Sequence, residues 1–226
     1  MTPDPGGIKM RASVTPKLGD GGRMWQEERR ARTEGCHCIA GIDEAGRGAL
    51  AGPVVAACVI LPFERAPVGV ADSKTLPVET RERLYSEIIS MARGVGIGIV
   101  DAATIDAINI LRATHEAMRL ALADLPPGLF PDVALIDGLP VRPFPLDQIA
   151  LVRGDGRSAS IAAASIIAKV TRDCLMRAYD HTFPEYGFAA HKGYPAPTHL
   201  RALEANGVSS LHRRTFRPVA VLLQMT

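Results

Sequence analysis

With 226 residues the chain is long for one domain and short for two, and its formal net charge of +2 neither requires nor excludes a nucleic-acid partner. The hydrophobic fraction of 47% is enough for a full core, and no apolar stretch reaches the ~20 residues of a transmembrane helix. The first residues lack the apolar segment of a signal peptide. We therefore expect a cytoplasmic, monomeric protein with no membrane partner.

Residues 1–35 mix proline, glycine and charged residues with little periodicity. This composition predicts a flexible N-terminal extension, with a short helix near 25–30. Residues 36–226 are expected to form one domain that includes a helical C-terminal segment from about residue 180.

The periodicity of this domain alternates between strands and helices. Two apolar runs separated by a glycine-rich turn are expected to pair as a hairpin, and an alternation of glycine with branched residues predicts a strand whose neighbour comes close. The predicted strands are 38–43, 53–61, 94–100, 133–136 and 149–152. The predicted helices are 76–93, 101–125, 160–180, 198–206 and 218–224. This order is typical of an α/β fold with a mixed five-stranded sheet and helices on its faces.

Three of the predicted strands end in an acid that is closely followed by glycine. These acids are Asp43 with its neighbour Glu44, then Asp137 and Asp155. Strand ends of α/β sheets gather ligands, and oxygen-only donors favour Mg²⁺ or Mn²⁺ over zinc. A single Asp-Gly pair is more often only a turn, but the repetition favours a metal site. Since side chains alternate along a strand, Asp43 and Glu44 reach one ion only if the strand breaks or Glu44 contributes through its backbone.

The loop Gly46-Arg47-Gly48 invites two other interpretations. A phosphate-binding P-loop requires Lys and Ser or Thr after its second glycine, whereas Arg47-Gly48 follow here. A dinucleotide-binding loop requires a third glycine where Ala51 stands, and a helix after it rather than a strand. Both interpretations fail.

Charge and cysteine placement add weaker signals. From Lys169 to the end the chain has eight Lys/Arg against four Asp/Glu, whereas residues 36–168 have eleven against fifteen. This distribution fits a cation site beside a polyanion-binding surface, and equally a solvated basic face. Cys36-His37-Cys38 has no second pair of ligands at matching spacing, so reduced thiols are the better interpretation.

Several motifs together resemble the ribonuclease HII family, the type 2 ribonucleases H. They are GIDEAGRG with the following LAGPVVA, ADSK, LIDG, RGD with SIAAASIIAKV, and HKGY, and they extend from about Ile39 to Val219. The resemblance implies a ribonuclease H-like fold with a C-terminal helical segment. It also implies an endonuclease that hydrolyses the RNA strand of RNA–DNA hybrids and nicks duplex DNA 5′ of embedded ribonucleotides. Two Mg²⁺ or Mn²⁺ ions would serve as cofactors, and the products would carry 3′-hydroxyl and 5′-phosphate ends.

The resemblance also assigns residues. The four active-site acids fall on Asp43, Glu44, Asp137 and Asp155. The backbone of Gly46-Arg47-Gly48 would read the ribose 2′-hydroxyl, the group that distinguishes RNA from DNA, and the ring of Tyr194 would pack on the next deoxyribose.

Other polar residues have less specific assignments. Ser73 and Lys74 match a substrate-binding pair, with Lys74 as a phosphate contact. Arg213 and Arg214 are either phosphate contacts or surface charges, and Asp173 is expected in an ion pair on a helix surface. Two alternatives stay open: a hybrid-binding module without activity, and a type 3 ribonuclease H. A replication-associated partner cannot be deduced from the sequence.

Overall fold

The computed structural model describes residues 21–70, 73 and 76–225. Five strands form one mixed sheet in the order β3-β2-β1-β4-β5. Their bounds are β1 (Ile39–Ala45), β2 (Val54–Ile60), β3 (Gly94–Val100), β4 (Val133–Asp137) and β5 (Gln148–Leu151). β1 pairs antiparallel with β2 and parallel with β4, so the predicted hairpin and the mixed five-stranded sheet are both confirmed.

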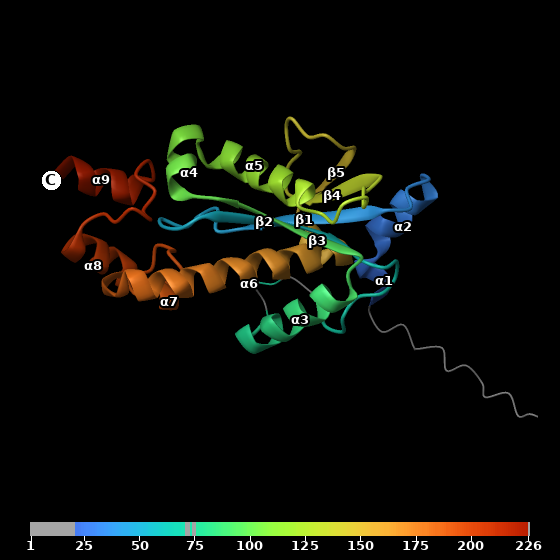
Figure 1. Cartoon of the computed structure of the whole chain (residues 1–226), viewed down its shortest axis with the longest axis horizontal. Helices are drawn as coiled ribbons and strands as arrows, with labels where there is room; N and C mark the ends of the chain where they lie inside the picture. Colours follow the sequence, from blue (N-terminus) through green and yellow to red (C-terminus); the bar gives the residue numbers. More distant parts are fainter. Residues whose placement is uncertain (1–20, 71–72, 74–75, 226) are drawn as a thin grey trace, which may run out of the picture.

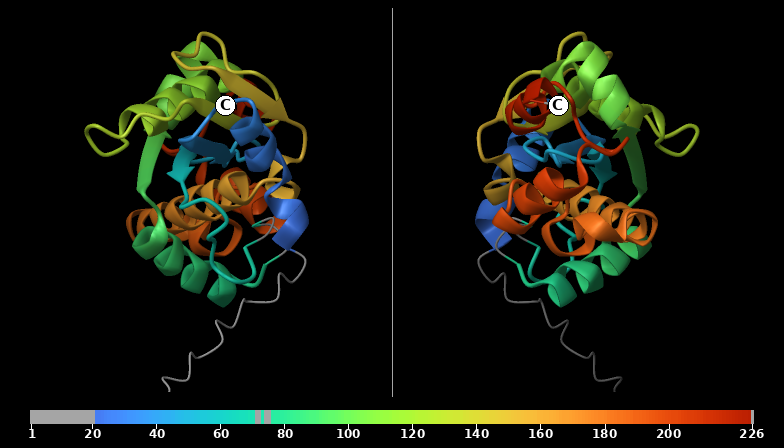
Figure 2. Two further views of the ribbon diagram at one scale, coloured as in Figure 1. Left: turned by 90° about the vertical axis from the view of Figure 1, so that its right-hand side faces the viewer. Right: turned by 90° about the vertical axis from the view of Figure 1, so that its left-hand side faces the viewer.

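Helices cover both faces of this sheet. They are α1 (Gly21–Met24), α2 (Gln26–Thr33), α3 (Val78–Met91), α4 (Ala102–Ile108), α5 (Ile110–Ala123), α6 (Ala159–Thr182), α7 (Phe188–His191), α8 (Pro197–Asn206) and α9 (Arg217–Met225). The end-on views show the sheet between a layer of α4 and α5 and a layer of α6 and α3 (Figures 1 and 2). Among the helices in the described ranges, none is long and apolar enough to cross a bilayer.

The alternation of side chains along β1 and β2 divides the core into two halves. Ile42 and Cys58 belong to the apolar cluster that includes α5, whereas Ala57 and Val59 belong to the cluster that includes α6. Both strands are buried on both faces, which explains their nearly continuous apolar sequence.

Glycines let helices approach the sheet closely at two places. A Cβ atom on Gly98 of β3 would lie 1.9 Å from the carbonyl oxygen of Ala117 in α5. On the other face, a Cβ atom on Gly41 of β1 would lie 2.0 Å from the carbonyl carbon of Ser160 in α6. The predicted close neighbour of β3 is therefore α5, and β1 lies directly against the first turn of α6.

Two expectations about helices need correction. Residues 1–20 of the predicted extension lie outside the described residues. Within residues 21–35 the predicted short helix is present as α2, but this part is not a flexible extension, because α2 packs on the domain and Trp25 and Ala31 are buried. The predicted helix 101–125 is two helices, since Asn109 adopts a left-handed φ of 68°. The side chain of Asn109 then accepts a hydrogen bond from the Arg112 amide and caps α5, while Asp101 caps α4.

The Gly41 contact gives a stability prediction. Gly41→Ala should lower the free energy of unfolding by about 3 kcal/mol, because the added methyl group would overlap the backbone of α6 and force β1 and α6 apart. Urea denaturation measures the change. Gly48→Ala is the matched control, since a Cβ atom there meets nothing within 4 Å, and it should shift the stability by less than about 0.5 kcal/mol. Equal stability of both variants would contradict this packing.

Candidate active site

Three of the predicted acids converge in the structure. Asp43 lies in β1, Asp137 ends β4, and Asp155 lies in a short 3-10 helix (Gly154–Gly156) after β5. One carboxylate oxygen from each lies within 4.8 Å of the others. β1 and β4 are parallel neighbours, so their carboxyl ends meet at one edge of the sheet.

The turn after β5 brings Asp155 back to the other two acids. Arg153 adopts a left-handed φ of 56°, and the Gly154 amide then donates a 2.7 Å hydrogen bond to Asp137 Oδ1. The sequence pattern predicts Asp155 at the end of a strand, and this prediction is not met. Asp155 lies four residues beyond the last residue of β5.

The environment of Asp43 calls for a positive charge. Asp43 is only 2% exposed, and burial raises its pKa well above the usual value, with further increases from the charges of Glu44 and Asp137. Hydrogen bonds from Ser165 and the Glu44 amide act in the opposite direction. Its Oδ2 atom is buried and has no hydrogen-bond partner among the described residues. A bound divalent cation would satisfy that oxygen and relieve the repulsion, and an all-carboxylate donor set suits Mg²⁺ or Mn²⁺.

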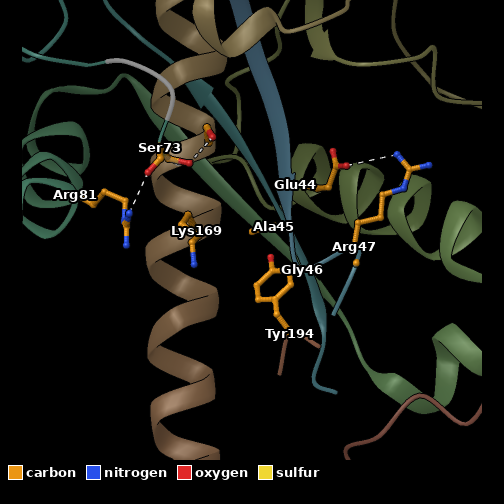
Figure 3. Close-up of a pocket in the computed structure, with 10 residues that line it drawn as sticks. Glu44, Ala45, Gly46, Arg47, Ser73, Arg81, Lys169 and Tyr194 are labelled. Carbon is orange, nitrogen blue, oxygen red and sulfur yellow. Dashed lines mark hydrogen bonds and ion pairs between the residues drawn. The ribbon is translucent and has the colours of Figure 1, made fainter. Parts of the chain in front are cut away.

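Glu44 does not belong to this cluster. β1 runs unbroken through Ala45, so Asp43 faces α6 and Glu44 faces the other side of the strand. The group of acids within 4.8 Å, taken over the described chain, contains Asp43, Asp137 and Asp155 but not Glu44. The carboxylate of Glu44 instead lies 3.7 Å from Arg47 Nη1 (Figure 3).

The loop Gly46-Arg47-Gly48 continues from β1 into a cleft of about 450 Å³. Gly46 has a φ of 92°, and a Cβ atom there would collide with the Arg172 side chain. The φ of Gly48 lies outside the left-handed region, and a Cβ atom there would meet nothing within 4 Å, so the fold itself does not require a glycine at this position. The missing side chain leaves backbone bare at the cleft, where a ligand can approach it.

Arg213 fixes this loop from behind. Its guanidinium is fully buried and donates hydrogen bonds to the carbonyl oxygens of Gly46, Arg47 and Gly52 at 2.8–3.0 Å. Burial lowers the pKa of Arg213 to about 9, so the group stays charged at neutral pH. Neither sequence interpretation of Arg213, as phosphate contact or surface charge, is correct. Arg214 is exposed, and its amide donates to Asp106.

Tyr194 closes the same cleft from the C-terminal part of the chain. Figure 3 shows its ring between Glu44 and Arg47 on one side and Ser73, Arg81 and Lys169 on the other. The guanidinium carbon of Arg172 lies 5.2 Å from the centre of the ring, and Arg172 also donates to the Lys192 carbonyl oxygen. Arg172 thus holds both sides of the cleft, because its other donors bind Pro53 and Ala51.

A histidine pair supports the backbone of Tyr194. His199 Nδ1 lies 2.9 Å from the Tyr194 carbonyl oxygen and so carries the proton, which makes its Nε2 an acceptor. His212 Nε2 donates across 3.1 Å to that nitrogen, and His212 Nδ1 accepts from the Ser209 amide. The two accepting nitrogens, His199 Nε2 and His212 Nδ1, require that both rings be neutral. The sequence shows four histidines in this region, but nothing in their spacing predicts this relay.

The remaining sequence predictions have mixed outcomes. Ser73 is buried, forms a 2.8 Å hydrogen bond with Ser165 and lines the cleft, whereas Lys74 lies outside the described residues. The ion pair of Asp173 with Lys169 is confirmed, but Asp173 is buried and not at the surface. No described His, Cys, Asp or Glu joins Cys36-His37-Cys38 in a metal cluster, and the amides of His37 and Cys38 bind Asp132.

Solved structures with a similar fold identify the structural class of this protein. Ribonuclease H2 from Pyrococcus horikoshii OT3 is similar with a TM-score of 0.72 and 27% identity, covering 84% of this chain and 98% of that one. Bst-RNase HIII, solved in complex with Mn²⁺, has a TM-score of 0.67 and 18% identity, covering 86% of this chain and 72% of that one. The sheet and its acidic cluster therefore belong to the ribonuclease H-like fold, the fold of metal-dependent ribonucleases H.

Sequence similarity identifies the family to which the chain belongs. A model of the family Ribonuclease HII matches residues 40–219. Ribonuclease HII of Geobacter sulfurreducens is 53% identical over 196 residues, which cover 87% of this chain and 89% of that protein. The chain belongs to the ribonuclease HII family, whose members are ribonuclease H endonucleases acting on nucleic acid.

The hydrogen bonds of the Arg213 guanidinium should contribute to the stability of the fold. Arg213→Lys should lower the free energy of unfolding by about 2–4 kcal/mol, because an ammonium cannot reproduce the fork of hydrogen bonds to three carbonyl oxygens. Guanidinium denaturation measures it. Arg214→Lys is the neighbouring control and should be neutral; a neutral Arg213→Lys would refute the bracing role.

The histidine relay predicts acid sensitivity. Burial, and then the nearby charge of His199, lower the pKa of His212 to about 4, so between about pH 6.5 and 4 the unfolded chain binds the extra proton. The contribution of His212 is complete above pH 6.5 and is lost as the pH falls. Stability should therefore drop by about 1–2 kcal/mol between pH 7 and 5 on account of this residue.

Urea denaturation at both pH values tests the histidine relay. His212→Gln should reduce the pH dependence, whereas the exposed His181→Gln should leave it unchanged. The same pH dependence in all three proteins would contradict the assignment.

Proposed function

We propose that this chain hydrolyses the RNA strand of RNA–DNA hybrids and nicks duplex DNA on the 5′ side of embedded ribonucleotides. The observation that supports the proposal most strongly is that β1 and the loop after it supply both an acid of the cluster and a wall of the cleft. Asp43 belongs to the acidic cluster, and the bare backbone of Gly46–Gly48 follows it directly into the cleft that Tyr194 closes. Phosphodiester chemistry and recognition of a sugar thus lie within a few residues of each other.

Asp43, Asp137 and Asp155 would hold the divalent cation, Mg²⁺ or Mn²⁺, and Glu44 at the rim of the cleft would complete the set for a second ion. When bound, such a pair of ions activates a water and stabilises the leaving oxygen of a phosphodiester, which gives 3′-hydroxyl and 5′-phosphate ends. The carboxylates supply the negative charge that localises the ions at the carboxyl edge of β1 and β4. The orphaned Oδ2 atom of Asp43 is the donor best placed for this role.

The substrate would be read by the other side of the cleft. The amides of the Gly46-Arg47-Gly48 loop, fixed by Arg213, are proposed to bind the ribose 2′-hydroxyl. The ring of Tyr194 is proposed to pack on the following deoxyribose, where a 2′-hydroxyl would clash. Ser73 lines the cleft opposite the loop, and with Lys74 is proposed to contact a phosphate.

Two alternatives are less well supported. A hybrid-binding module without activity would not need three acids within 4.8 Å of one another. A type 3 ribonuclease H shares the fold, but Bst-RNase HIII is 18% identical to this chain, against 53% for ribonuclease HII of Geobacter sulfurreducens. A cleavage assay separates the first alternative from the proposal.

The decisive substrate is a duplex DNA with a single ribonucleotide. Asp43→Asn should reduce its Mg²⁺-dependent nicking by about 10³-fold, because a carboxylate of the ion site loses its charge. Mapping of the products should place the cut 5′ of the ribonucleotide. The exposed Asp147→Asn is the control and should nick at the wild-type rate. Wild-type nicking by Asp43→Asn would overturn the proposed function.

A further inference from the structure

Helix α2 lies outside the segment that the family model matches, yet it packs against the domain where β5 leads into α6. Trp25, just before α2, packs in the apolar cluster that contains Ala159 at the start of α6. Ala31 packs with Leu151 of β5 and Ile161 of α6. The views in Figures 1 and 2 show α2 beside the beginning of β1. α2 therefore contacts both elements between which Asp155 lies.

Glu28 of α2 caps the first turn of α6. Its side chain is 1% exposed, and Oε1 accepts hydrogen bonds from Ser158 Oγ at 2.6 Å and from the Ser160 amide at 3.0 Å. Ser158 Oγ in turn accepts from the Ile161 amide at 3.1 Å. The Glu28 carboxylate thus satisfies the Ser160 amide, one of the groups that a helix start leaves without an intrahelical partner, and it lies at the positive end of the helix dipole.

The capped turn follows directly on the short 3-10 helix that contains Asp155. The amides of Arg157 and Ser158 both donate 2.8 Å hydrogen bonds to the Gly154 carbonyl oxygen. Glu27, also buried, forms an ion pair with Arg157. The segment Gly154–Ser158 is therefore closed on itself and attached to α2 at its C-terminal end.

The other end of this segment is attached to the acidic cluster. The Gly154 amide donates to Asp137 Oδ1 at 2.7 Å, and a Cβ atom on Gly154 would lie 2.6 Å from Ile161 Cδ1 and 3.1 Å from Leu151 Cβ. The backbone that carries Asp155 is therefore held at both ends, by Asp137 on one side and by α2 on the other. Loss of the α2 contacts would release one of these two ends.

We propose that Glu28 is a positioning residue that, through Ser158 and the first turn of α6, holds Asp155 in place for a divalent cation. The inference rests on the proposed function, because it takes Asp155 as part of the ion site. It assigns a role in metal binding to a residue that touches neither the ion nor the substrate. Residues that orient metal ligands from outside typically change metal affinity by about 10- to 100-fold, and the indirect path from Glu28 points to the lower end of this range.

Direct binding of Mn²⁺ to the full chain, followed by the electron paramagnetic resonance of the free ion, tests this role without measuring activity. Glu28→Ala removes both hydrogen bonds and should weaken Mn²⁺ binding about tenfold at a temperature where the protein is fully folded. Glu28→Gln keeps an oxygen in the position of Oε1 and should bind within about threefold of wild type. Glu34→Gln, which changes an exposed acid just after α2, is the matched control and should bind like wild type.

A purely structural role predicts a different pattern. Glu28→Ala would then melt at a lower temperature but bind Mn²⁺ with wild-type affinity when folded, and this result would overturn the inference. If Glu28→Ala does not fold, Ser158→Ala carries the test, because it cuts the link between Glu28 and the α6 turn and should weaken binding about threefold.

Asp155→Asn separates this inference from the proposed function. Weakened binding in Asp155→Asn with wild-type binding in Glu28→Ala rejects only the positioning role. Wild-type binding in Asp155→Asn rejects the proposed ion site, and the positioning role with it. Mn²⁺ binding that depends on both residues in a protein that nicks no ribonucleotide-containing duplex rejects the proposed reaction but supports the positioning.

Discussion

The structure depends on a group of carboxylates held closer together than their charges favour. Asp43 is buried, carries an oxygen with no hydrogen-bond partner in the described part of the chain, and shares its site with Asp137 and Asp155. Its raised pKa expresses the cost of this arrangement in the absence of a cation. Helices pack on both faces of β1 and β4, and this packing keeps the acids together despite the repulsion between them. A divalent cation bound between these carboxylates would remove the repulsion, and the same closely spaced negative charges would then favour its binding.

Two buried arginines give the site its second half. Arg172 and Arg213 bind backbone carbonyl oxygens rather than carboxylates, and those carbonyls belong to the loop after β1 and to the segment before Tyr194. Both guanidinium groups therefore fix the backbone around the cleft and do not neutralise an acidic side chain. They set the distance between the loop and the tyrosine ring, and therefore the width of the cleft in which a sugar would be recognised. The neutral histidines behind Tyr194 serve the same purpose without adding charge.

Much of this was accessible from the sequence, because strand-end acids and glycine spacing are local patterns. The mixed sheet, its hairpin and the convergence of Asp43, Asp137 and Asp155 follow from such patterns. Glu44 follows Asp43 directly in the sequence, but β1 continues without a break, so side-chain alternation directs Glu44 to the other face of the strand. The role of Arg213 could not be predicted, since its partners are carbonyl groups more than 150 residues earlier in the chain, which every residue type possesses. The docking of residues 21–35 could not be predicted either, because Glu28 binds Ser158, which lies 130 residues later in the chain.

The central claim is that the converged acids form a cation site, and the most direct measurement is anomalous diffraction at the manganese edge from crystals of the full chain grown with Mn²⁺. The account predicts a manganese peak within coordination distance of carboxylate oxygens from Asp43, Asp137 and Asp155, and its loss in Asp43→Asn. Crystals in which manganese occupies only surface acids, with the three carboxylates unchanged and without an ion between them, would contradict it.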